Sequence, residues 1–213
     1  MTDRVRVMAA CGLLMILSGL SYGGALEQQV SQQVVRLHIV ANSDSPEDQR
    51  LKLQVRDAVL EQCGEWFTGG TAQQVRENLA GRLEELERVC EEEAALQGRP
   101  CEATATLTTM YFSTRDYGAF SLPAGQYEAL RVELGEGQGH NWWCVMYPPL
   151  CVGTATGLPD PEEVCRQYQL EDGTIDLITS PQGDGKAQVK FKLAEWYGQG
   201  RQWLAQCLGR SQK

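Results

Sequence analysis

The chain has 213 residues, of which 42% are hydrophobic and 22% are charged. This balance is typical of a globular protein with its own core, and it excludes a disordered chain or a protein with several membrane spans. The formal net charge of -9 disfavours binding to nucleic acid and adsorption to anionic lipid, because the phosphate groups would be repelled.

One continuous apolar run lies near the start of the chain, at residues 7–20. Two arginines precede it and a stretch of small residues up to Ala25 follows it, which is the layout of a signal peptide. The run is shorter than the roughly 20 residues that a membrane-spanning helix needs. We expect residues 1–25 to be a signal peptide or an uncleaved N-terminal anchor, and residues 26–213 to be the exported domain. Membrane contact is expected only through the apolar run, if it stays uncleaved.

The next segment predicts a strand followed by a helix. Residues 34–41 alternate between apolar and polar side chains, with Arg36 and His38 on the polar side of the strand. Ser45 then predicts a helix start as an N-cap, with a proline in the first helical position and Asp48 as the acidic partner of a capping box. A pair of glycines after the apolar stripe is expected to end this helix.

A second helix is expected after the glycines, with Thr71 as its cap and apolar residues at helical spacing as far as Cys90. No structure is assigned to residues 152–185. β-branched and aromatic content predicts strands at residues 101–113, 127–134, 141–147 and 188–193, and apolar spacing predicts a short helix at 199–208. The order of elements predicts an α+β fold: a single domain with an antiparallel or mixed sheet and two long N-terminal helices packed on one side.

The eight cysteines contain no C-x-x-C pair, and the chain has two histidines. A zinc site therefore has little support, and we expect no metal or other cofactor. Cys144 and Cys151 are the first pair to test for a disulfide, because they lie seven residues apart around a Pro-Pro turn in an exported chain. Cys63 and Cys90 fall on apolar helical faces and are expected to be small core residues.

Two long blocks of sequence resemble the stage II sporulation protein R family of endospore-forming Firmicutes. The first block, residues 36–57, reads R-L-H-I-V-A-N-S-D-S-P-E-D-Q-R-L-K-L-Q-V-R-D. The second contains L-P-A-G at 122–125, Y-E-A-L-R at 127–131 and N-W-W-C-V-M-Y-P-P-L-C at 141–151. A third, short match is V-K-F-K at 189–192.

This resemblance implies a non-enzymatic signalling protein that is exported during sporulation into the space between the forespore and mother-cell membranes. Its implied partner is a membrane-embedded aspartic protease of the mother cell, which would then cleave the precursor of sporulation sigma factor E. Composition and spacing alone imply none of these roles, although an exported, acidic and compact protein is compatible with them.

The alternative function is that of a cell-wall or thiol hydrolase. His140, Asn141 and Cys144 supply the imidazole, amide and thiol that such an enzyme needs. In an extended strand, however, His140 and Cys144 lie about 13 Å apart at ~3.3 Å per residue, too far for a hydrogen bond. We therefore expect no catalytic residue.

The remaining candidates concern metal or partner binding. His38 with Asp44 and Asp48 could form an acid–base or metal group, but helix capping and the helix dipole account for both carboxylates. Adjacent tryptophans on a strand point to opposite faces, so one of them can anchor a partner, unless both are covered by other elements. The expected partner-binding surface comprises Asn42, Asp44, Asp48, Trp142, Trp143 and Tyr147.

Overall fold

The computed structural model describes residues 28–68, 70–151 and 160–179, together with isolated positions between 7 and 25 and residue 200. By its contacts the chain divides into a first unit, residues 32–110 and 127–175, and a second unit, residues 1–31, 111–126 and 176–213. The expected export segment, the strand at 188–193 and the helix at 199–208 lie mostly or wholly outside the described residues.

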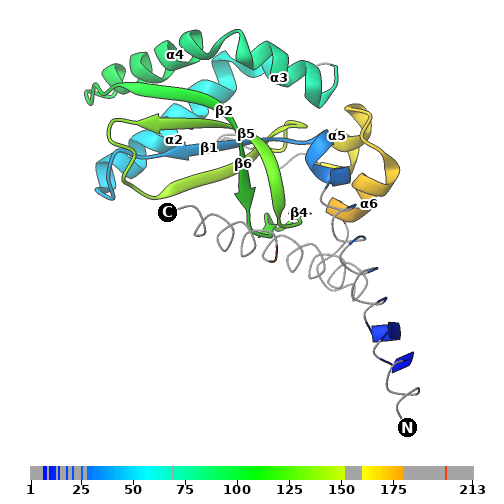
Figure 1. The fold of residues 1–213 in the computed structure, drawn as a ribbon. Helices are drawn as coiled ribbons and strands as arrows, with labels where there is room; N and C mark the ends of the chain where they lie inside the picture. Colours follow the sequence, from blue (N-terminus) through cyan, green and yellow to red (C-terminus); the bar gives the residue numbers. More distant parts are fainter. Residues whose placement is uncertain are drawn as a thin grey trace. The chain divides into compact units, whose positions relative to one another are not determined.

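A four-stranded sheet is the centre of the first unit. Its strands have the spatial order β2-β5-β1-β6 (Figure 1) and comprise β1 (Val35–Val40), β2 (Ala103–Phe112), β5 (Gly125–Leu134) and β6 (Asn141–Tyr147). β1 pairs parallel with β5 and antiparallel with β6, so the sheet is mixed.

Helices cover one face of this sheet (Figure 1): α2 (Pro46–Gln62), α3 (Ala72–Ala80) and α4 (Leu83–Leu96), with a short 3-10 helix, η1 (Gly64–Phe67), after α2. Val55 of α2 and Leu86 of α4 are fully buried in the same apolar cluster as Leu37 of β1. Cys63 and Cys90 are also buried there, as predicted for core residues. The predicted α+β class, with a mixed sheet and helices on one side, is confirmed.

The second predicted helix is in fact two helices. α3 ends at Gly81 and α4 begins after Arg82, because glycine is a poor helix former and closes the first helix at its C-cap. The apolar spacing in the sequence gives no sign of this break, because Leu79 and Leu86 on either side of it are buried in the same core. The first helix is also shorter than expected, because at Gly64 the α-helix gives way to the 3-10 turn.

All six residues of β1 are buried, including its two polar ones. Leu37 pairs with Leu130 and with Cys144, and these partners share the helix-covered face. Arg36 lies on the opposite face with no exposed surface, and its guanidinium carbon is 5.2 Å from the centre of the Tyr127 ring. The central strand therefore separates an apolar layer from a polar one.

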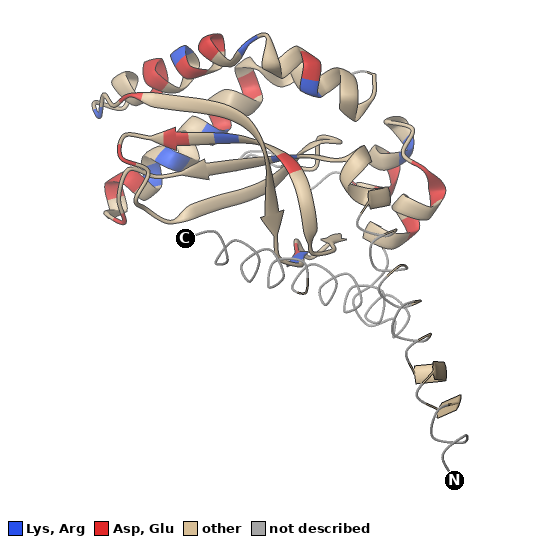
Figure 2. Cartoon of the chain, viewed as in Figure 1, with Lys and Arg blue, Asp and Glu red and all other residues tan. Residues whose placement is uncertain are grey.

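The edge strand β2 is closed by side chains of α4. The backbone N–H groups of Ala103 and Ala105 donate to the carboxylates of Glu91 and Glu87, at 3.1 and 2.7 Å. The two glutamates lie one helical turn apart on α4, a helix that carries several acidic residues (Figure 2). They occupy hydrogen-bonding groups through which another strand would attach to β2.

The segment without a predicted structure contains two short helices, α5 (Pro161–Gln167) and α6 (Asp172–Thr179). Asp160 caps α5 by accepting from the backbone N–H of Glu162 at 3.0 Å. In the second unit, β3 (Arg115–Asp116) and β4 (Ser121–Leu122) form a two-stranded antiparallel pair. None of the described helices has the length and apolar character needed to cross a membrane.

The position of β1 in the core predicts a large stability effect for one leucine and a small one for another. Leu37 has no exposed surface, whereas 79% of Leu96 is exposed. We expect Leu37→Ala to lower the free energy of unfolding by about 2–5 kcal/mol, and the control Leu96→Ala to change it by less than about 0.5 kcal/mol. Urea titration followed by circular dichroism measures both, and similar losses would contradict the assignment of β1 to the core.

Candidate functional site

The loop after β1 and the turn between β5 and β6 meet at one end of the sheet, and we call residues 41–48 and 135–140 the loop–turn junction. The backbone N–H of Gly139 donates to the carbonyl of Ala41 at 2.8 Å, and that of Glu136 donates to the side-chain oxygen of Asn42 at 3.0 Å. Gly135 has a φ of +57°, and a side chain there would collide with that of Asn42. Glycine therefore permits both the turn and the close approach.

Asp48 is the buried centre of the junction, with 4% of its surface exposed. Its carboxylate accepts hydrogen bonds from Ser43 Oγ at 2.6 Å, from Asn42 Nδ2 at 2.9 Å and from the Arg99 guanidinium at 2.7 Å. The hydrogen bonds from Ser43 and Asn42, followed by Arg99, lower the pKa of Asp48 to about 2. The carboxylate is therefore ionised and ties together the loop, α2 and the segment that follows α4.

The predicted capping box at the start of α2 is formed only in half. The Ser45 hydroxyl accepts from the backbone N–H of Asp48 at 3.1 Å, as an N-cap does. The prediction of the second hydrogen bond of the box is wrong, because the backbone N–H of Ser45 donates to Ser43 Oγ at 3.2 Å instead of to the Asp48 carboxylate. The Asp48 carboxylate is engaged by the loop and by Arg99. Thr71, by contrast, caps α3 in a complete box with Gln74.

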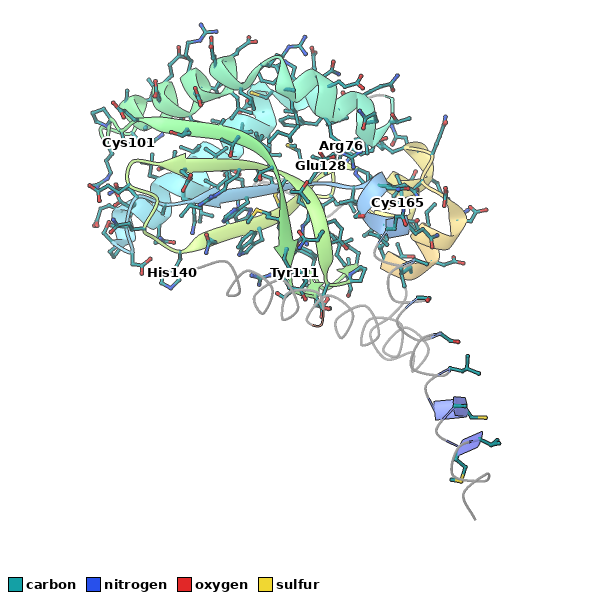
Figure 3. All side chains as sticks on the ribbon, in the orientation of Figure 1. Arg76, Cys101, Tyr111, Glu128, His140 and Cys165 are labelled. Atoms are coloured by element: carbon teal, nitrogen blue, oxygen red, sulfur yellow. A yellow bond between two sulfur atoms is a disulfide. The ribbon has the colours of Figure 1, made fainter. Side chains whose placement is uncertain are left out.

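Lys52 and Asp44 hold the other side of the turn. Lys52 is buried, and its ammonium group donates to the carbonyl of His140 at 2.8 Å and to Gln49 Oε1 at 2.6 Å. Burial lowers the pKa of Lys52. Asp44 accepts from the backbone N–H of His140 at 2.7 Å and contacts its ring. Both the Asp44 and the His140 side chains are exposed, and Figure 3 shows His140 at the outer surface of the molecule.

His38 lies on the polar face of the sheet, away from both aspartates of the candidate metal group. Its ring stacks on Trp143 at 3.7 Å between centres, and Nε2 lies 2.7 Å from Asn141 Oδ1. Burial lowers the pKa of His38 below its ordinary value. No group of three His, Cys, Asp or Glu side chains that could hold a metal ion occurs in the described part of the chain.

The two tryptophans point to opposite faces of β6, and both are half-buried. Trp142 pairs with Ile39 and packs against the core, with the Arg56 guanidinium carbon 4.5 Å from the centre of an aromatic ring of its side chain. Trp143 pairs with His38 on the polar face. Of the two, Trp142 belongs to the helix-covered side, next to the loop–turn junction.

Tyr147 lies at the opposite end of β6, so the structure divides the predicted surface into two parts. Its hydroxyl donates to the carbonyl of Gly70 at 2.6 Å, and its ring meets that of Tyr168 edge to face, 5.5 Å between centres. The five residue steps from Trp142 to Tyr147 span about 17 Å in a strand. Asn42, Asp44 and Asp48 come together at the junction, whereas Trp142 and Trp143 lie on β6 beyond the end of its turn and Tyr147 lies at the far end of that strand.

Cys144 and Cys151 form a disulfide, with their Cα atoms 5.4 Å apart. Cys144 consequently carries no thiol that His140 could deprotonate, and the His140 ring contacts Asp44. Cys63 and Cys165 are buried free thiols, and burial raises the pKa of each to about 11. At neutral pH these two cysteines are protonated and poorly suited to nucleophilic chemistry.

Sequence reasoning missed two residues that contact the junction, and one cavity. Arg99 follows α4 in the sequence, 51 residues from its partner Asp48, and Lys52 is a charged residue that is buried in the structure. A cavity of about 480 Å³ next to Tyr147 is lined largely by glutamines. The recurrence of glutamine at 32–33 and at 167 and 169 was a signal for it, although only the fold brings these pairs together.

Comparisons with known proteins agree on one family. The model of the family described as stage II sporulation protein R matches residues 31–156. The chain is 32% identical over 208 residues to stage II sporulation protein R of Bacillus subtilis (strain 168), a match that covers 86% of this chain and 93% of that protein. No solved structure is significantly similar to the chain.

The hydrogen bonds of Asp48 predict a loss of stability in acid. Its pKa is lowered from 3.8 to about 2, so its contribution is fully present above about pH 4 and is lost as the pH falls through about 2. We expect Asp48→Asn to cost about 2 kcal/mol of unfolding free energy at pH 7, and this difference from the wild type to shrink between pH 4 and pH 2.

Urea titrations at pH 7, 4, 3 and 2 measure this difference. Glu47→Gln, which changes an exposed carboxylate one residue earlier, is the matched control and should have a small effect throughout. An Asp48→Asn deficit that stays constant down to pH 2 would show that the carboxylate's charge is not what stabilises the junction.

Proposed function

Because this chain belongs to the stage II sporulation protein R family, we propose that it is an exported sporulation signal that activates a membrane-embedded aspartic protease of the mother cell. The protease would then process the precursor of sporulation sigma factor E. In this proposal the protein acts from the space between the forespore and mother-cell membranes. It acts by binding and performs no chemistry itself.

Activation by binding requires a surface that prefers the active arrangement of the protease. The loop–turn junction is our candidate for that surface. The choice depends on one observation, which is that exposed side chains here lie above buried, hydrogen-bonded ones. Asp44 and His140 are exposed, while Asp48 and Lys52 beneath them are buried and hydrogen-bonded. A partner therefore meets side chains whose backbone is already held in place, which lowers the entropic cost of binding.

The proposed role makes two separate predictions. Deleting the gene in its host should abolish timely processing of the sigma factor E precursor, and normal processing would refute the signalling role itself.

In the complemented strain, Asp44→Asn should weaken signalling about tenfold, because a charge-assisted hydrogen bond contributes on the order of 1.5 kcal/mol. Immunoblots of the precursor over time measure both effects.

The matched control for the surface is Glu92→Gln, which removes one exposed carboxylate from α4. It should leave processing unchanged. A photoreactive residue in place of His140 should capture the protease in sporulating cells, whereas one in place of Glu92 should not. If Asp44→Asn behaves like Glu92→Gln while deletion blocks processing, the signalling role stands and the junction is not its binding surface.

The alternative function, a hydrolase with Cys144 as nucleophile, is disfavoured by the disulfide. A structural bridge predicts that Cys144→Ser and Cys151→Ser each lower the free energy of unfolding by the same amount, about 2–3 kcal/mol, and impair signalling equally. A nucleophilic Cys144 instead predicts unequal effects on activity, since Cys151→Ser would free the Cys144 thiol and keep activity, whereas Cys144→Ser would abolish it. Urea titration and the processing assay on both variants separate the two functions.

A further inference from the structure

The cavity at the Tyr147 end of β6 has the size of a small-ligand site. Its volume is about 480 Å³, within the range of roughly 300–1,000 Å³ that such sites occupy. Its walls come from the residues before β1, the start of α3, the end of β6 and the residues after α5. Five glutamines and two tyrosines line it, and no Asp, Glu, Lys, Arg or His does so among the described residues. We call it the glutamine cavity.

Hydrogen bonds hold the walls of the glutamine cavity together. Gln33 donates from Nε2 to Thr174 Oγ1 at 3.0 Å and accepts from the backbone N–H of Glu171 at 2.7 Å. Arg76 of α3 donates to the carbonyl of Gln32 at 3.2 Å and forms an ion pair with Glu128 of β5 (Figure 3). The segment before β1 is thus tied to α3, to the sheet and to the start of α6. Because these contacts lie within the protein, the cavity is pre-formed and does not need a ligand to shape it.

Gln169 occupies a backbone position in this cavity that favours glycine. Its φ is +55°, in the left-handed region, where a side chain is disfavoured. The position follows the C-cap of α5, and the backbone N–H of Leu170 closes the helix end by donating to the carbonyl of Cys165 at 3.1 Å. Glycine is the usual residue at this place. A glutamine here costs stability, and Gln169 is an exposed residue that lines the cavity, so the outlier points to a role for this residue in the cavity.

We propose that the glutamine cavity binds a neutral oligosaccharide. Side-chain amides both donate and accept hydrogen bonds, which matches the paired hydroxyl groups of a sugar ring. The Gln33 amide is engaged in the wall and Gln73 donates to Glu77. The sugar would therefore be held mainly by the other lining glutamines, Gln32, Gln167 and Gln169. The half-buried Tyr168 adds an aromatic surface against which the apolar face of a sugar can pack. An anionic ligand fits poorly, because no cationic side chain lines the described cavity and the chain carries a net charge of -9.

A peptide ligand fits this cavity less well than a sugar does. Extended peptides are commonly bound by adding a strand to an exposed sheet edge, where backbone groups supply the affinity. Here the walls are the ends of elements, and only Tyr147 comes from a strand. Recognition must therefore come mainly from side-chain amides and hydroxyls. The proposal goes beyond the signalling role and does not require it, since binding is measured on the protein alone.

The test uses the full chain in mild detergent, with chitotriose and cellotriose as probes. Calorimetry or saturation-transfer NMR should detect saturable binding of at least one of the two sugars. Gln169→Gly should weaken that binding about tenfold, which corresponds to the loss of one good hydrogen bond. The same variant should raise Tm by about 2–4 °C, because glycine relieves the left-handed backbone.

A gain in stability together with a loss of binding cannot arise from misfolding, so this variant separates the two effects. Gln62→Ala, at the exposed end of α2 and outside the cavity, is the control and should bind as the wild type does. The proposal is overturned if neither sugar binds, or if Gln169→Gly and Gln62→Ala bind with equal affinity.

Discussion

One buried carboxylate, that of Asp48, connects the parts of the molecule that the rest of the structure depends on. A charge with 4% of its surface exposed is costly unless it is hydrogen-bonded, and Asn42, Ser43 and Arg99 all donate to it. These donors come from the loop after the central strand and from the segment that follows α4. Through Asn42 the connection reaches the β5–β6 turn. If any one donor is removed, the buried charge of Asp48 keeps fewer hydrogen bonds. The junction therefore depends on all three donors together.

The central position of β1 determines where the loop–turn junction lies. A strand that is parallel to one neighbour and antiparallel to the other brings the loop that follows it beside the turn that enters β6. The same strand begins next to the glutamine cavity, because Gln32 and Gln33 precede it. The two candidate surfaces therefore lie at the two ends of one buried strand and share a core. A ligand at one end and a partner at the other would bind next to opposite ends of the same strand.

Local patterns predicted the local features well. The strand expected at 141–147 has the bounds of β6, and Ser45 and Thr71 cap their helices. The partners of Asp48 could not be predicted in this way, because Arg99 meets it only after α2 and α4 have packed together. The same limit applies to the glutamine cavity, because its recurring glutamines come from separate segments that only the fold brings together. The break at Gly81 was missed for another reason: the helices on both sides bury the same apolar stripe.

The glutamates that close β2 also affect how copies of the protein meet one another. Glu87 and Glu91 accept hydrogen bonds from the strand's own backbone, so that edge presents carboxylates where an open strand would present donors. Two molecules approaching along this edge would bring like charges face to face. A protein at high concentration in a confined space would be kept apart from its own copies at β2, and this repulsion would weaken as the ionic strength rises.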